Sequence, residues 1–154
     1  CLCPGDAPRF VVMAPQVADG VCRGALAGGG AARMVDGDLQ SVMAGLACGE
    51  PNTISWGILR NHATAFVSCP DWVSARGMRM LGVPVKGDPV VISGESGAVG
   101  MGLIAAIMET DEYKELREAI GLDRFSQVLM FSTEGNTDPR KCRKVRGDGE
   151  YPTF

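Results

Sequence analysis

Short apolar runs alternate with amphipathic stretches along this chain, and each change of pattern marks a predicted element. Five runs rich in β-branched or large apolar residues predict strands, at residues 10–13, 32–35, 65–68, 90–92 and 128–131. These runs are apolar throughout, which is typical of strands in a sheet whose two faces are both covered by helices. The pattern therefore predicts an α/β fold with a mostly parallel sheet and helices on both faces.

Helical periodicity fills the intervals between these runs. Apolar residues spaced by three and four positions predict helices at residues 18–27, 39–46, 53–61, 71–81, 99–108 and 111–120. Asp38 and Asn52 (or Thr53) are expected to cap two of these helices at the start, and Gly121 is expected to end the last one.

The composition fits one domain, or a piece of one, with enough apolar material for a core. The chain has 154 residues, 45% of them hydrophobic, and a net charge of −3. Acids and bases are interleaved, which argues against nucleic acid as a partner, and we interpret the basic cluster at 140–146 as a solvated terminal segment. No apolar run is long enough to span a membrane and no signal peptide is visible, so we expect a cytoplasmic protein with no membrane partner.

The six cysteines fit no zinc-binding pattern, because no second cysteine pair matches Cys1 and Cys3 and the chain has one histidine. We therefore expect no metal site and interpret the cysteines as reduced structural thiols. The alternative is a bridge between Cys22 and Cys48, which would sit on helices flanking one strand and could contribute about 3 kcal/mol.

Three predicted strands end in a serine: Ser68, Ser93 and Ser132. Two of them continue into small polar turns that each carry one carboxylate, Glu95 and Glu134. The carboxyl ends of parallel strands meet at one edge of a sheet, so the two turns are expected to converge on a ligand there.

Two simpler interpretations of the first turn fail. Residues 94–98 resemble the nucleophile elbow of a serine hydrolase with Ser96 as nucleophile, but His62 precedes Ser96 and no histidine follows it. A serine hydrolase using Ser96 is therefore a remote alternative. The glycine spacing fits neither a P-loop nor a dinucleotide fingerprint.

Five runs together carry a close resemblance to a known enzyme family, the diaminopropionate ammonia-lyases. They read MAGLACGEPN (43–52), FVSC (66–69), GMRMLG (77–82), ISGESGAVG (92–100) and FSTEGNTD (131–138). The resemblance extends from about residue 10 to 138 and implies the tryptophan synthase β-like fold, which is fold type II of the pyridoxal-phosphate enzymes.

The resemblance implies an α,β-elimination that converts an amino-acid substrate, 2,3-diaminopropionate, to pyruvate and ammonia, with pyridoxal 5'-phosphate as electron sink. It also implies a homodimer. Ser132 matches the serine that faces the pyridine nitrogen of the cofactor in this fold type. The resemblance places six further residues along the cofactor: Ser93, Gly94, Glu95, Thr133, Glu134 and Gly135.

The same resemblance implies that part of the enzyme is missing. In the family, the Schiff-base lysine, the general bases and the phosphate-binding loop come from the N-terminal part of the chain. We therefore expect residues 1–154 to be the C-terminal portion of such a lyase, without a catalytic residue of its own and inactive alone. The alternative is a non-catalytic α/β module that binds a ligand or partner.

Overall fold

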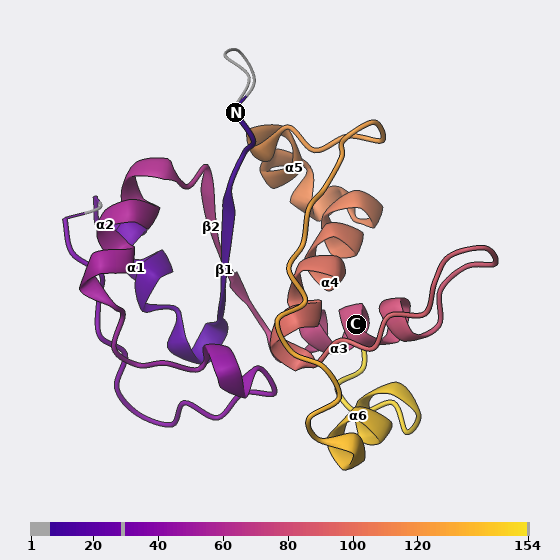
Figure 1. Cartoon of the computed structure of the whole chain (residues 1–154). Helices are drawn as coiled ribbons and strands as arrows, with labels where there is room; N and C mark the ends of the chain where they lie inside the picture. Colours follow the sequence, from indigo (N-terminus) through magenta and orange to yellow (C-terminus); the bar gives the residue numbers. More distant parts are fainter. Residues whose placement is uncertain (1–6, 29, 154) are drawn as a thin grey trace.

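The computed structural model describes residues 7–28 and 30–153, so Cys1 and Cys3 lie outside the described residues. Two strands, six α-helices and three short 3₁₀ helices follow one another in this part of the chain (Figure 1). In chain order they are β1 (Val11–Pro15), η1 (Gln16–Ala18), α1 (Gly20–Leu26), η2 (Ala44–Leu46), α2 (Thr53–His62), β2 (Ala65–Cys69), α3 (Asp71–Gly82), α4 (Glu95–Glu109), η3 (Asp111–Tyr113), α5 (Lys114–Ile120) and α6 (Pro139–Arg146).

The two strands form a parallel pair that separates two layers of helices. Their register runs from Val11 opposite Ala65 to Pro15 opposite Cys69. On one face Phe66 contacts Trp56 of α2, with ring centroids 5.8 Å apart. Its neighbour Val67 points the other way and packs against the core built by α3 and α4. The predicted α/β architecture, with a parallel sheet between helices, is confirmed (Figure 1).

Helices α3 and α4 approach each other backbone to backbone. A Cβ atom added at Gly77 of α3 would overlap the carbonyl oxygen of Ala98, and one added at Gly102 of α4 would overlap that of Val73. The hydroxyl of Ser74, which is fully buried, donates a hydrogen bond to the carbonyl of Glu95 at the start of α4. Small residues at the crossing therefore set the position of α4 relative to the sheet.

Three predicted strands are wrong: residues 32–35, 90–92 and 128–131 have no regular secondary structure and belong to no sheet among the described residues. A strand requires a neighbouring strand to accept and donate its ladder hydrogen bonds. Residues 90–92 bond instead to the end of α3, where Val91 N–H donates to the carbonyl of Leu81 at 2.9 Å. The apolar pattern predicted strands at these positions, but it could not show that neighbouring strands to pair with are absent from the described residues.

The predicted helix at 39–46 is also wrong, apart from the single turn η2 at its end. The carboxylate of Asp71 accepts hydrogen bonds from the hydroxyl of Ser41 at 2.6 Å and from the N–H of Val42 at 3.0 Å. The side chain of Asp38 closes a local turn by accepting from Gln40 N–H at 3.0 Å. Both contacts hold the backbone away from helical geometry.

The interpretation of the basic cluster at 140–146 as a solvated terminal segment is wrong. The segment forms α6, whose Cys142 and Val145 are buried against the core. The side chain of Asp138 caps its first turn, and the Arg146 guanidinium donates to the carbonyl of Gly82 at 3.0 Å. An apolar stripe among the charges explains this docking, because Cys142 and Val145 face the core while Arg140, Arg143 and Lys144 remain exposed.

The alternative of a Cys22–Cys48 bridge is wrong in this structure, where both thiols are free. Cys22 is buried in α1, whereas Cys48 is exposed. Desolvation, with a smaller effect of the Asp19 carboxylate, raises the pKa of Cys22 to about 11. Burial likewise raises the pKa of Cys69 to about 12, so both groups are held as protonated thiols.

None of the helices in the described part of the chain is long and apolar enough to cross a membrane.

The α3–α4 crossing gives a direct test with a matched control. Gly77→Ala is expected to lower the free energy of unfolding by about 3 kcal/mol, because the new methyl group must push two backbones apart. Gly57→Ala, in the middle of α2 with open space around it, is expected to raise it by about 0.5 kcal/mol. Urea unfolding of both variants measures the difference, and equal effects would contradict backbone-to-backbone packing.

The thiols should differ in reactivity. At pH 8 Cys48 is expected to react fast with a maleimide, and Cys22 about 100-fold more slowly, because a pKa near 11 leaves little thiolate. Peptide mapping after timed labelling separates the sites. Fast modification of Cys22 in the folded chain would show that it is not buried as described.

Candidate functional site

Residues 92–94 lead directly into α4, and Ser93, Gly94 and Glu95 at this junction are buried. Gly94 is the N-cap of α4, with no side chain to cap the helix itself. Ser93 is 2% exposed and Glu95 is 7% exposed. The unpaired N–H groups of this helix end therefore have to find acceptors from another segment.

The second turn, residues 132–137, supplies those contacts. The Ser132 hydroxyl donates to the hydroxyl of Ser93 at 2.8 Å, and Gly94 N–H donates to the carbonyl of Glu134 at 2.8 Å. The two turns that the sequence placed at one sheet edge are thus in direct contact. Ser68, the third strand-end serine, is not part of this contact, because its hydroxyl donates to Asp19 at 2.9 Å.

The carboxylate of Glu134 caps α4 from outside the helix. Its Oε2 atom accepts from Ser96 N–H at 3.3 Å, and its Oε1 atom accepts from the Thr137 hydroxyl at 3.0 Å. A negative charge at a helix start is favourable because of the helix dipole. This role was not visible from the sequence, since the cap comes from a segment 38 residues away.

Glycines allow the turns to approach this closely. A Cβ atom at Gly97 would lie 2.6 Å from the Ser93 hydroxyl and 3.2 Å from the Cα atom of Ser132, and one at Gly94 would lie 2.7 Å from Glu134 Cδ. Thr133 and Gly135 are exposed on the outer side of the second turn. We call the surface formed by Ser93, Gly94, Gly97 and Ser132 the platform. Ser132 lies at its exposed side.

Ser96 lacks the partner that a serine nucleophile needs. Its hydroxyl is buried without a hydrogen-bond partner, as is the Oε1 atom of Glu95. His62 ends α2, just before β2 begins, whereas the turns lie beyond the other end of the strands. The structure therefore provides no base for a serine hydrolase at Ser96 within the described residues.

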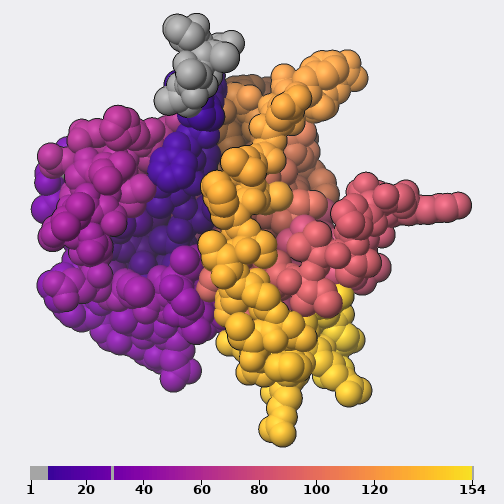
Figure 2. Space-filling model, viewed as in Figure 1, coloured from indigo at the N-terminus to yellow at the C-terminus, as the bar shows by residue number. Residues whose placement is uncertain are grey.

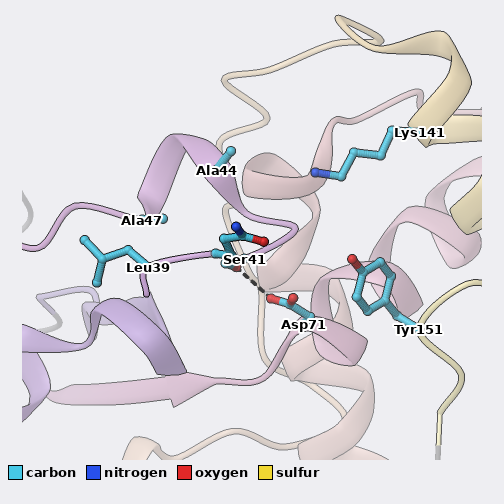
Figure 3. Close-up of a pocket in the computed structure, with 8 residues that line it drawn as sticks. Leu39, Ser41, Ala44, Ala47, Asp71, Lys141 and Tyr151 are labelled. Carbon is cyan, nitrogen blue, oxygen red and sulfur yellow. Dashed lines mark hydrogen bonds between the residues drawn. The ribbon is translucent and has the colours of Figure 1, made fainter. Parts of the chain in front are cut away.

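A pocket of about 560 Å³ lies next to the two turns, where η2, α3 and α6 meet (Figure 3). Its loop touches the first turn, since a Cβ atom at Gly45 would lie 3.0 Å from the hydroxyl of Ser96. The pocket is lined by Leu39, Gln40, Ser41, Ala44, Ala47, Asp71, Lys141 and Tyr151.

This pocket was not predicted from the sequence, because its polar residues come from three distant segments. Lys141 Nζ donates to the carbonyl of Val42 at 3.3 Å, and the carbonyl of Tyr151 accepts from Arg79 at 3.0 Å. Desolvation raises the pKa of the Tyr151 phenol, with smaller contributions from the carboxylates of Glu150, Asp71 and Glu95. The one available signal was the acidic residue that follows Pro70 at the start of a predicted helix.

Solved structures identify the class of the fold. A crystal structure of diaminopropionate ammonia lyase from Escherichia coli in complex with an aminoacrylate-PLP azomethine reaction intermediate matches with a TM-score of 0.80 and 44% identity, over 92% of this chain and 35% of that one. The same lyase in complex with D-serine matches with a TM-score of 0.82 and 42% identity, over 94% of this chain and 35% of that one. The fold is therefore that of the fold type II pyridoxal-phosphate enzymes.

Sequence comparison finds homologues of this chain among enzymes of one kind. Diaminopropionate ammonia-lyase of Escherichia coli (strain K12) is 46% identical over 141 residues, which are 92% of this chain and 35% of the relative. No protein-family model matches the chain. The chain is a homologue of the diaminopropionate ammonia-lyases and spans about a third of the length of the curated relatives it matches.

The contact between the turns predicts an energetic coupling. Gly94→Ala is expected to cost about 2 kcal/mol in the free energy of unfolding, because its methyl group collides with the Glu134 side chain. In a Glu134→Ala background the same change should cost less than half as much. Additive effects in this double-mutant cycle would mean that the Glu134 side chain does not lie against Gly94.

Proposed function

We propose that this chain forms one wall of the cofactor site of a pyridoxal-phosphate-dependent diaminopropionate ammonia-lyase. The reaction is the α,β-elimination of 2,3-diaminopropionate to pyruvate and ammonia. The observation that carries the proposal is the hydrogen bond between the hydroxyls of Ser93 and Ser132, two residues that the family resemblance assigns to the cofactor site.

The groups around Ser132 suit a neutral ring nitrogen. Glu134 is the nearest carboxylate along the chain, and both of its oxygens already accept hydrogen bonds from Ser96 and Thr137. The group offered at the open side of the platform is therefore a hydroxyl. A hydroxyl leaves a pyridine nitrogen largely unprotonated, whereas a carboxylate would favour its protonated form.

Ser93 would act as the positioning residue of this hydroxyl. The hydrogens of the two serines can reverse, so that Ser93 donates to Ser132 and Ser132 donates to an acceptor on the platform. Because Ser93 is almost fully buried, it holds the Ser132 oxygen in place. Gly94 and Gly97 keep the platform low enough for a flat ring, and Glu95, Thr133, Glu134 and Gly135 complete the proposed wall.

When bound, pyridoxal phosphate supplies an electron sink for negative charge at the α-carbon of the substrate. The lysine that would hold the cofactor, the phosphate-binding loop and the general bases are expected in the part of the family that this chain does not span. As the resemblance implies, the enzyme would work as a homodimer, and we propose the cytoplasm as its location.

A chimera tests the proposal. When this chain replaces the aligned region of the Escherichia coli lyase, the hybrid is expected to show the visible absorbance band of lysine-bound cofactor and to release pyruvate from 2,3-diaminopropionate. Ser132→Ala should lower kcat/KM about tenfold through loss of one hydrogen bond, whereas Ser55→Ala on exposed α2 should leave it unchanged.

The 154-residue chain alone should show neither the band nor turnover. A folded hybrid that binds cofactor but releases no pyruvate would contradict the proposed reaction. Turnover by the chain alone would contradict the assignment of the lysine and the general bases to the part that this chain does not span.

A further inference from the structure

The pocket where η2, α3 and α6 meet presents opposite charges to the same space. Lys141 of α6 and Asp71 of α3 both line it, and its volume is about 560 Å³. No salt bridge joins these two groups in the described part of the chain, so they do not neutralise each other directly. In Figure 3 the Tyr151 hydroxyl points toward the space between them. A small molecule in this pocket would therefore meet a cation, an anion and a hydroxyl.

Both charged groups keep unused hydrogen-bonding capacity. Lys141 Nζ donates to the carbonyl of Val42 at 3.3 Å, which occupies one of its N–H groups and leaves the others. Each oxygen of the Asp71 carboxylate accepts one hydrogen bond, from the Ser41 hydroxyl at 2.6 Å and from Val42 N–H at 3.0 Å, and keeps a further lone pair. These bonds hold the two charges in place, and both can still bind a ligand.

Tyr151 is held at the pocket in a conformation that bulky residues rarely adopt. Its φ of 58° lies in the left-handed region, and the Arg79 guanidinium holds the segment there by donating to the carbonyls of Tyr151 at 3.0 Å and of Glu150 at 3.2 Å. This C-terminal segment lies at the lower edge of the molecule in Figure 2, in yellow. The phenol hydroxyl has no hydrogen-bond partner among the described residues, and desolvation raises its pKa, so it stays a donor.

The wall of the pocket that lies across from Tyr151 is apolar. Leu39, Ala44 and Ala47 line it (Figure 3). A polar group placed against these side chains would lose water without gaining a hydrogen bond, whereas a short hydrocarbon group loses nothing by contact with them. The pocket thus combines a polar half, which suits a dipolar head group, with an apolar half, which suits an aliphatic side chain.

We propose that this pocket binds a small aliphatic α-amino acid as its zwitterion. The ligand carboxylate would lie between Lys141 and Tyr151, its ammonium group would donate to Asp71, and its side chain would pack on the apolar wall. A simple anion or a simple amine would pair with one of the two charges and leave the other without a partner. The inference goes beyond the proposed elimination, because 2,3-diaminopropionate would place a second ammonium group against the apolar wall.

Binding is measured with the 154-residue chain and L-alanine as the probe. The chain has two tyrosines, so isotope-labelled tyrosine rings give two NMR signals to follow. Alanine is expected to shift the signal of Tyr151 with a dissociation constant in the millimolar range and to leave that of Tyr113, in η3, unchanged. Propionate, ethylamine and 2,3-diaminopropionate are each expected to bind about tenfold more weakly than alanine, because each leaves one contact unmade or unfavourable.

Variants followed by calorimetry test the residues. Lys141→Gln is expected to weaken alanine binding about tenfold, and Tyr151→Phe about threefold, through loss of hydrogen bonds to the ligand carboxylate. Lys144→Gln makes the same change at an exposed position of α6 and should leave the affinity unchanged. Tyr151→Phe removes a hydroxyl without a partner in the described structure, so it tests the pocket even if Lys141→Gln disturbs the contact with Val42.

Four results would overturn the proposal. Propionate that binds as tightly as alanine would make the pocket a simple anion site, and 2,3-diaminopropionate that binds more tightly would make it a substrate site. Alanine binding that neither Lys141→Gln nor Tyr151→Phe weakens, or no alanine binding in the millimolar range, would also overturn it. Alanine binding by a chain whose hybrid lyase releases no pyruvate would support the proposal and contradict the proposed elimination alone.

Discussion

The close crossing of α3 and α4 is the contact on which the rest of the structure depends. Gly77, Ala98 and Gly102 let the two backbones touch, which no larger residue would allow. The crossing fixes where α4 begins, and Ser74 locks that point through the carbonyl of Glu95. Because the first turn of α4 carries the candidate site, a steric constraint in the core sets the position of groups at the surface.

The second turn is tied to this helix start by polar contacts. Glu134 provides the cap that Gly94 cannot provide, and this turns the carboxylate inward. Ser132, held by Ser93, is left at the open side. The same cap thus stabilises α4 and keeps the Glu134 carboxylate occupied. A ligand on the platform would therefore meet the Ser132 hydroxyl and not a carboxylate.

The C-terminal region packs against α3 and lines the pocket beside the two turns. The guanidinium of Arg79 in α3 donates to the carbonyls of Val145, Glu150 and Tyr151. These three hydrogen bonds hold Tyr151 at the pocket, which Lys141 and Asp71 also line. Hydrogen bonds to backbone carbonyls explain how a segment rich in cations can dock on a core helix without many ion pairs.

The sequence by itself determined β1, β2 and most of α3 and α4, because apolar periodicity acts locally. It also predicted that the turns at Ser93 and Ser132 meet, but the two strands assumed in that prediction are absent from the sheet, so the contact is made by the tertiary structure. It could not show that residues 128–131 lack a ladder, since a strand depends on neighbours that its own residues do not specify. It also missed the helix cap of Glu134 and the Asp71 contact that prevents a helix at 39–46. Those features were decided by the tertiary structure, because their hydrogen-bond partners are about 30 to 40 residues away along the chain.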